Sequence, residues 1–261
     1  MIRLVNRLLS SVGATVVRQQ RPPSSVRREY AARLGALRRR PPERFAAVVG
    51  DSRFDLGDHP AGYVDWECAF TAEQLRRIQP GLTLDVGSYR HFVMGLLAHY
   101  SVTTVDVRSR QAMLTGESVV TCDAKDLRLP DASFDAVVSL CALEHFGLGR
   151  YGDDFDIDAD LKAFGEMLRV LKPGGRIIFT TTVRRGEPLL AFNAHRIYSF
   201  DLLRSLTSGL SCEEERFFSR SKGGFCALSE LPLTDSPDGG SWDVYCGCWR
   251  KGLPSPVPDT V

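Results

Sequence analysis

The feature that most constrains the fold is a regular alternation of short apolar runs with helix-like segments between residues 71 and 183. The apolar runs at residues 82–87, 102–107, 119–123, 134–140 and 176–183 predict buried parallel strands. Helices are predicted between them, and such an alternation requires right-handed crossovers. The sequence therefore predicts an α/β fold with a mostly parallel sheet that is covered by helices on both faces.

The predicted helices are bounded by local signals. Thr71 is placed to cap a short helix that ends before Pro80 and Gly81, and a second helix is expected over residues 89–100. A third helix carries a core-facing stripe and stops at Lys172; the stripe consists of Leu161, Phe164, Leu168 and Leu171. After residue 200 we expect a helix over 200–206, a strand near 214–219 and a final strand over 242–249.

The length of 261 residues fits one large α/β domain with irregular ends. We expect a basic arm and linker at residues 1–45, the domain at 46–252 and a flexible tail at 253–261. The formal net charge of +1 excludes a strong overall field that would attract nucleic acid, and no interleaved aromatic residues accompany the basic arm. No nucleic-acid partner is therefore expected, and the oligomeric state stays open.

The arm concentrates positive charge, with ten arginines and one acid, Glu29, in residues 1–40. On a helical projection of residues 2–18, Ile2, Val5, Leu9, Val12 and Val16 share one face, opposite Arg3, Arg7 and Arg18. Such a helix can lie in a membrane interface, pack on its own domain or serve in targeting. The pairs Pro22-Pro23 and Pro41-Pro42 predict linkers or helix ends. A cytoplasmic protein with peripheral membrane contact through the arm is one expectation.

Two residue groups raise the question of a metal. The seven cysteines are scattered, and Cys246 and Cys248 lack a second pair that would complete a zinc site, so reduced thiols are expected. Residues 153–160 contain five aspartates but lack the glycine and distal glutamate of a calcium loop. These acids precede a helix, where negative charge complements the helix dipole. No metal is expected.

Acidic and small residues at the ends of the predicted strands indicate a nucleotide-like cofactor. In an open parallel sheet, ligands bind beyond the carboxyl ends of the strands. Asp85, Gly87 and Ser88 end the first strand, and Asp106 ends the second, where it can accept hydrogen bonds from ribose hydroxyls. Asp123 and Ala124 end the third, near the expected adenine edge.

The loop after the first strand separates two cofactor classes. The glycine-rich pattern that holds a pyrophosphate is absent, since Ser88, Tyr89, Arg90 and His91 follow Gly87. S-adenosylmethionine has no pyrophosphate and tolerates a bulkier loop. The sequence therefore favours S-adenosylmethionine over a nicotinamide cofactor.

Four segments in order resemble the motifs of class I S-adenosylmethionine-dependent methyltransferases. They are residues 84–88 (LDVGS), 105–106 (VD), 129–139 (LPDASFDAVVS) and 168–176 (LRVLKPGGR). The resemblance covers about residues 80–185 and implies a Rossmann-like sheet of seven strands whose last strand is antiparallel. It also implies a cofactor site formed by the first-loop residues, Asp106 and Asp123, to which we add Ser139 at the end of the third segment.

A narrower resemblance concerns residues 143–153 (LEHFGLGRYGD) and 192–198 (FNAHRIY). These segments are similar to those of a methyltransferase-like family of unknown function, some of whose members are associated with glycan biosynthesis. The resemblance implies a small-molecule or glycan acceptor.

The same two segments supply the candidates for chemistry. Methyl transfer to an alcohol requires alignment of the reactants and a base for the hydroxyl proton. His145 and His195 are candidate bases, because neutral imidazole is available near pH 7, and Glu144 is an alternative base or orienting group. Candidate acceptor-binding residues are Arg150, Tyr151, Asn193, Arg196 and Tyr198. Each histidine can instead serve only to fix a turn or loop.

The predicted function is O-methylation of a small-molecule or glycan hydroxyl with S-adenosylmethionine as cofactor. Three alternatives stay open: another class of acceptor, a non-catalytic cofactor-binding or scaffold protein, and a nicotinamide-dependent oxidoreductase. The loop after Gly87, which carries Tyr89, Arg90 and His91 where the methyltransferase family has more glycine, is the reason to keep the scaffold.

Overall fold

The computed structural model describes residues 23–43, 47–50 and 61–253. The chain divides into two compact units, residues 1–60 and 61–261. Much of the segment around the predicted domain boundary at 45/46 lies outside the described residues, so that boundary stays a prediction. The helix expected at residues 2–18 and most of the tail also lie outside them. None of the helices in the described ranges is long and apolar enough to span a membrane.

The first unit contains helix α2 (Ser24–Arg39), in a stretch that the sequence predicted only as arm and linker. The helix begins after Pro23 and ends before Arg40, which Pro41 follows. Its residues are rich in Arg, Ala and Leu, which have high helix propensity, and proline ends helices because it lacks the N–H donor. None of its residues is buried.

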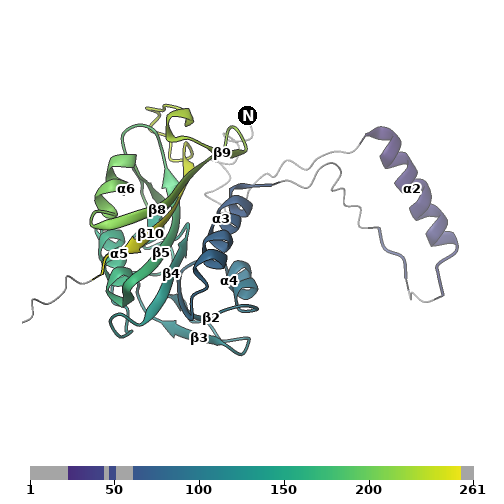
Figure 1. The fold of residues 1–261 in the computed structure, drawn as a ribbon. Helices are drawn as coiled ribbons and strands as arrows, with labels where there is room; N and C mark the ends of the chain where they lie inside the picture. Colours follow the sequence, from purple (N-terminus) through teal and green to yellow (C-terminus); the bar gives the residue numbers. More distant parts are fainter. Residues whose placement is uncertain (1–22, 44–46, 51–60, 254–261) are drawn as a thin grey trace, which may run out of the picture. The chain divides into compact units, whose positions relative to one another are not determined.

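The second unit is built around one large sheet (Figure 1). Its parallel strands are β1 (Leu82–Val86), β2 (Ser101–Asp106), β3 (Glu117–Thr121), β4 (Phe134–Leu140) and β5 (Leu171–Val183). The remaining strands are β8 (Leu210–Ser219), β9 (Gly224–Cys226) and β10 (Asp243–Lys251). The strand order is β3-β2-β1-β4-β5-β10-β8-β9, so chain order reverses between β1 and β4.

The predicted strand count of seven is wrong. Within residues 61–253 the main sheet has eight strands, because β9 pairs antiparallel with β8 at one edge. The predicted antiparallel last strand is confirmed: β10 pairs antiparallel with both β5 and β8. The sequence missed β9 because a strand of three residues carries no measurable alternation.

Helices cover both faces of the sheet (Figure 1). On one face, α3 (Tyr63–Ile78) and α4 (Arg90–Leu96) contribute Phe70, Leu75 and Val93 to the core. On the other face, α5 (Ala159–Val170) and α6 (Phe200–Leu206) contribute Phe164 and Leu203. The apolar side chains of the strands alternate between the two clusters, as a buried sheet requires.

Two helix predictions need correction. α3 begins at Tyr63, eight residues before the expected cap, and Thr71 is buried within it. Asp65 accepts a hydrogen bond from the N–H of Gly62 (2.7 Å), which stabilises the earlier start. In α5 the core face lies at Ala163, Phe164, Met167 and Val170, whereas Leu161 is 56% exposed.

Between β5 and α6 the chain forms a small hairpin of β6 (Leu189–Ala191) and β7 (His195–Ile197). Two short 3-10 helices, η2 (Leu143–His145) and η3 (Leu228–Glu230), follow β4 and β9 respectively. The β7 residues contact η2, which brings the two predicted histidine segments together. This arrangement forms one wall of the site described next.

Candidate active site

A cavity of about 1010 Å³ opens at the carboxyl ends of β1, β2 and β4, where strand order reverses. This is the expected position for a ligand in a sheet of this kind. Loops after these strands and the β6–β7 turn form its walls. Nine of the predicted site residues line it: Gly87, Ser88, Asp106, Glu144, His145, Arg150, Tyr151, Asn193 and His195.

A smaller and more apolar hollow of about 70 Å³ adjoins the cavity and shares Gly87, Asp106 and Tyr151 with it. Asp123 and Ala124, predicted to meet an adenine ring, line this hollow. Its apolar lining comes from the ends of β1 and β2 and from the segments after β2 and β4: Val86, Val105, Val107, Ala142 and Phe146. A flat aromatic base fits such a lining better than a polar group does.

Gly87 is the turn residue that allows a ligand to approach β1. Its φ is +75°, a region that favours glycine, and its N–H donates to the carbonyl of Val105. A Cβ atom on Gly87 would lie 3.0 Å from the Cβ of Ala142. The backbone conformation and the lack of a side chain therefore keep the junction of cavity and hollow open.

Asp106 lies at the end of β2 and already carries two arginine partners. The Nε and Nη2 atoms of Arg108 donate to its two carboxylate oxygens (3.0 and 2.9 Å), and Arg110 Nη2 donates to Oδ2 (2.9 Å). Burial raises the pKa of Asp106, but the hydrogen bonds from Arg108 outweigh this effect and hold the pKa below its ordinary value. Asp106 is therefore an ionised acceptor whose present partners compete with any ribose hydroxyl.

Asp85 and Ser139 do not line the cavity or the hollow. Asp85 is fully buried and both of its carboxylate oxygens lack a hydrogen-bond partner, so burial raises its pKa to about 7. The hydroxyl of Ser139 donates to the carbonyl of Val86 (2.9 Å) and joins β4 to β1. Ser88 lines the cavity, and its hydroxyl accepts a hydrogen bond from the N–H of Leu140 (3.0 Å).

His145 and Glu144, in η2, form a buried pair. His145 Nδ1 lies 2.6 Å from the carbonyl oxygen of Ala194, which makes Nδ1 the protonated nitrogen and leaves Nε2 as an acceptor. Nε2 lies 3.8 Å from Glu144 Oε1. Burial lowers the pKa of His145 to about 4 and raises the pKa of Glu144 to about 8. Near neutral pH both groups are uncharged.

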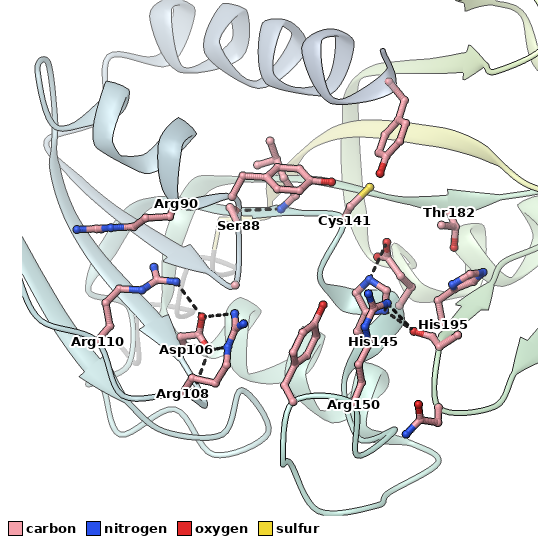
Figure 2. Close-up of a pocket in the computed structure, with 18 of the residues that line it drawn as sticks. Ser88, Arg90, Asp106, Arg108, Arg110, Cys141, His145, Arg150, Thr182 and His195 are labelled. Atoms are coloured by element: carbon pink, nitrogen blue, oxygen red, sulfur yellow. Dashed lines mark hydrogen bonds and ion pairs between the residues drawn. The ribbon is translucent and has the colours of Figure 1, made fainter. Parts of the chain in front are cut away.

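His195 reaches the same cavity from β7 (Figure 2). Its Nε2 lies 2.8 Å from the carbonyl oxygen of Gly239, so Nε2 donates and Nδ1 is free to accept a proton. The rings of His145 and His195 are 6.2 Å apart between centroids. Two imidazole rings therefore face a single cavity, each with one nitrogen hydrogen-bonded to a backbone carbonyl.

Arg196 and Tyr198, predicted to bind the acceptor, line neither the cavity nor the adjoining hollow. Arg196 is buried and donates to the carbonyl oxygens of Phe146 and Ile157 (2.7 Å each). The Tyr198 hydroxyl donates to Asp160 (2.8 Å), which also pairs with Arg196 (3.3 Å). Alternation along β7 turns His195 toward the cavity and its neighbour away from it, a difference that the motif could not show.

The sequence prediction missed three arginines that line the cavity, Arg90, Arg108 and Arg110. Figure 2 shows them on the side of Asp106, across from His145, Arg150 and His195. Arg108 and Arg110 closely follow the strand-ending Asp106, and this spacing was a signal that could have identified them. Arg90 makes two hydrogen bonds to Glu117, a contact between distant segments that the sequence could not reveal.

The residues present fit S-adenosylmethionine. The apolar hollow beside Asp123 suits adenine, Asp106 suits ribose hydroxyls, and Gly87 leaves room for the chain that joins the two ends of the cofactor. Within the described ranges, no group of three or more His, Cys, Asp or Glu side chains is placed to hold a metal ion. Of the predicted acidic cluster, Asp156 and Asp160 have basic partners, Lys162 and Arg196.

Comparison with known proteins agrees with this fit. Residues 84–179 match the model of a methyltransferase domain. No curated protein sequence matches the chain. Among solved structures, a Burkholderia thailandensis 1,6-didemethyltoxoflavin-N1-methyltransferase is 16% identical with a TM-score of 0.54, covering 91% of this chain and 93% of that one.

Two further structures share the fold. The cyclase SpnF is 20% identical with a TM-score of 0.52, covering 76% of this chain and 85% of its own. A putative sarcosine dimethylglycine methyltransferase from Galdieria sulphuraria is 18% identical with a TM-score of 0.51, and the match covers 71% of this chain and 85% of that one. At these identities the likeness concerns the fold, whereas the domain match concerns the segment that forms the cofactor side of the cavity. Residues 84–179 therefore carry a methyltransferase domain, and this match together with the shared fold supports an S-adenosylmethionine-dependent methyltransferase.

Proposed function

We propose that the chain transfers the methyl group of S-adenosylmethionine to a hydroxyl group of a small molecule or glycan. The observation that supports this acceptor class is the pair of histidines, His145 and His195, that face one large and polar cavity next to the cofactor hollow. An alcohol loses its proton as the new bond forms, and a positioned imidazole can accept it. The narrower resemblance of residues 143–153 and 192–198 adds the glycan as a candidate.

When bound, S-adenosylmethionine supplies a methyl group activated by a positively charged sulfur. The chain supplies the geometry: Asp106 binds the ribose hydroxyls, and the hollow beside Asp123 and Ala124 binds the adenine. Burial holds the pKa of His145 at about 4 and makes its ring a weak base, so we assign the role of proton acceptor to His195. Asn193, Arg150 and Tyr151 orient the acceptor from the side of the cavity that also carries the two histidines.

The first test is calorimetric titration of the full chain with S-adenosylmethionine, S-adenosylhomocysteine and NAD. We expect saturable binding of the first two alone, and about tenfold weaker binding in Asp106→Asn, which loses a charged acceptor. Asp126→Asn is the matched control, since the Asp126 side chain is 81% exposed and lies outside both hollows. Unchanged affinity in Asp106→Asn would refute the assignment of the ribose site.

The second test concerns proton transfer. Once a hydroxylated acceptor has been found by transfer of labelled methyl, we expect His195→Gln to lower kcat by about a hundredfold and to change KM little. Full turnover by both His145→Gln and His195→Gln would exclude a histidine base.

A non-catalytic, cofactor-binding or scaffold role is the second candidate. It is favoured by the contacts of Arg108 and Arg110 with Asp106, which a ribose must displace. Failure of all three ligands to bind the folded chain would support a scaffold and refute the enzyme.

A further inference from the structure

The cavity has an excess of positive charge that the proposed transfer to a neutral hydroxyl does not require. Four arginines line it, Arg90, Arg108, Arg110 and Arg150, against two acids, Asp106 and Glu144. The pKa of Glu144, raised by burial to about 8, leaves this acid uncharged near neutral pH. Asp106 is then the one ionised acid among the described residues that line the cavity.

The arginines differ in how fully they are paired. Arg90 is neutralised by Glu117, which lies outside the cavity lining. Arg108 and Arg110 share the single carboxylate of Asp106. Arg150 donates to the carbonyl of Ala194 (3.1 Å) and, within the described part of the chain, pairs with no carboxylate. Nη1 of Arg110 is buried without a hydrogen-bond partner, although this residue lines the cavity.

Cofactor binding at Asp106 would free one guanidinium group from its carboxylate partner. Asp106 has two carboxylate oxygens, and Arg108 and Arg110 occupy both. Ribose hydroxyls that donate to these oxygens compete with the guanidinium groups for the same lone pairs. Arg108 is the partner that can leave, since its side chain is 56% exposed whereas that of Arg110 is 16% exposed.

Arg108 lies beside Tyr151 while it is still paired with Asp106. Its guanidinium carbon lies 4.6 Å from the ring centroid of Tyr151, and that of Arg150 lies 5.2 Å from the same centroid. Tyr151 borders both the apolar hollow and the larger cavity. Two guanidinium groups therefore contact the same ring where the hollow joins the larger cavity. A guanidinium group donates hydrogen bonds in a geometry that suits a phosphate or a carboxylate.

We infer that the acceptor carries a phosphate or carboxylate group which Arg108 and Arg150 bind beside Tyr151, and that Arg108 becomes available for it when the cofactor displaces this side chain from Asp106. This inference rests on the proposed function, because it requires the cofactor to bind at Asp106. It makes the binding of cofactor and anion cooperative, with Arg108 as the shared element. The acceptor class narrows from any alcohol to one with an anionic group.

The experiment titrates inorganic phosphate into the full chain, with and without saturating S-adenosylhomocysteine, at constant ionic strength. We expect S-adenosylhomocysteine to tighten phosphate binding by about tenfold, and phosphate to tighten S-adenosylhomocysteine binding by the same factor. 5′-Methylthioadenosine, which has the ribose but no carboxylate, is the second ligand. Enhancement by this ligand but not by S-adenosylhomocysteine would mean that the cofactor's own carboxylate takes the released arginine, and would overturn the inference.

Arg108→Gln separates this role from a structural one, because the two affinities should change in opposite directions. S-adenosylhomocysteine binding should tighten by about threefold to tenfold, since Asp106 loses a competing partner, whereas phosphate binding should weaken by about tenfold. Arg150→Gln should weaken phosphate binding and leave S-adenosylhomocysteine binding unchanged. Arg128→Gln is the control, as its side chain is 78% exposed and lies outside the cavity.

The outcomes distinguish the two proposals. If S-adenosylhomocysteine does not bind the folded chain, the proposed function fails and this inference fails with it. Two results would overturn the inference alone while S-adenosylhomocysteine still binds. One is a phosphate affinity that is the same with and without S-adenosylhomocysteine, and the other is a phosphate affinity that is the same in wild type and Arg108→Gln.

Discussion

Burial has changed the acid–base character of the residues that border the cavity. Glu144 is 1% exposed and accepts a hydrogen bond from the hydroxyl of Thr181 (2.9 Å), and burial raises its pKa to about 8. His145 beside it has a pKa lowered to about 4 by the same cause. A buried group that must ionise couples folding to pH.

The raised pKa of Glu144 should make the chain less stable as the pH rises. Between its ordinary pKa and about 8, Glu144 is protonated in the folded chain and ionised in the unfolded chain, so the folded state binds more protons and stability falls as pH rises. His145 changes charge only below its ordinary value and does not contribute between pH 7 and 8. We expect the free energy of unfolding to fall by about 1 kcal/mol between pH 7 and 8 in urea titrations.

Glu144→Gln should lose most of this slope, because the amide does not titrate. Glu230→Gln is the control: Glu230 is exposed, and its pKa is lowered, chiefly by a hydrogen bond from the N–H of Ala227, so it stays ionised throughout this range. An equal slope in wild type and Glu144→Gln would show that Glu144 is not the titrating group.

At the scale of elements, the segment between η2 and α5 carries Arg150 and Tyr151 and depends on a few fixed points. Arg196 of β7 donates to the carbonyl oxygens of Phe146 and Ile157, near the two ends of this segment. Gly147 has a φ of +69°, and a Cβ atom there would lie 2.3 Å from the backbone oxygen of Asp156. The segment is therefore closed on itself by backbone contacts.

The second prediction compares two glycines of this segment. Gly147→Ala should lower the free energy of unfolding by about 3 kcal/mol, because it combines a strained φ with a clash against backbone. Gly152→Ala should cost about 1 kcal/mol, since its φ is also positive (+84°) but an added Cβ would meet no atom within 4 Å. Urea denaturation of both variants checks this, and equal losses would contradict the role of the contact at Gly147.

At the scale of the whole molecule, the core belongs to the second unit. The buried apolar residues of the described chain run from Phe70 to Trp249, and both core clusters are formed within these limits. α2 buries none of its residues. The folding energy that comes from apolar burial is thus contained in residues 61–253.

Because the buried apolar residues of the described chain lie in the second unit, removal of residues 1–60 should change its stability little. A chain of residues 61–261 should unfold with a Tm within about 3 °C of that of the full chain, because its core is complete. It should also bind S-adenosylhomocysteine with unchanged affinity, since the cavity lining begins at Tyr63. A large loss of Tm would show that residues 1–60 contribute to the core.

The fourth prediction concerns the basic arm. We expect the full chain to sediment with phosphatidylcholine vesicles that contain phosphatidylserine, because each arginine near such a surface contributes about 1 kcal/mol. Residues 61–261 should not sediment, and binding of the full chain should fall as salt is raised. Equal sedimentation of both chains would exclude the arm as the membrane contact.

The sequence alone determined the class of fold and the edge of the sheet at which the cavity opens. Apolar runs that end in Asp85 and Asp106 are local signals, and parallel strands bring their carboxyl ends to one edge whatever the rest of the chain does. β1, β2, β3, β4 and α6 consequently lie close to where the sequence predicted them. Asp106, Asp123 and His145 border the two hollows for the same reason, whereas His195 reaches the larger cavity from the β6–β7 hairpin.

Only the tertiary structure decided which way individual side chains face and what they contact. Arg196 and His195 are neighbours in sequence, yet one holds a loop and the other faces the cavity, because β7 turns them to opposite sides. Burial of Asp85 and Glu144, and the hydrogen bonds of Arg108 to Asp106, arise from segments that meet in space. Strand periodicity is written in the sequence, but the environment that sets a pKa or pairs an arginine exists only after the chain has packed.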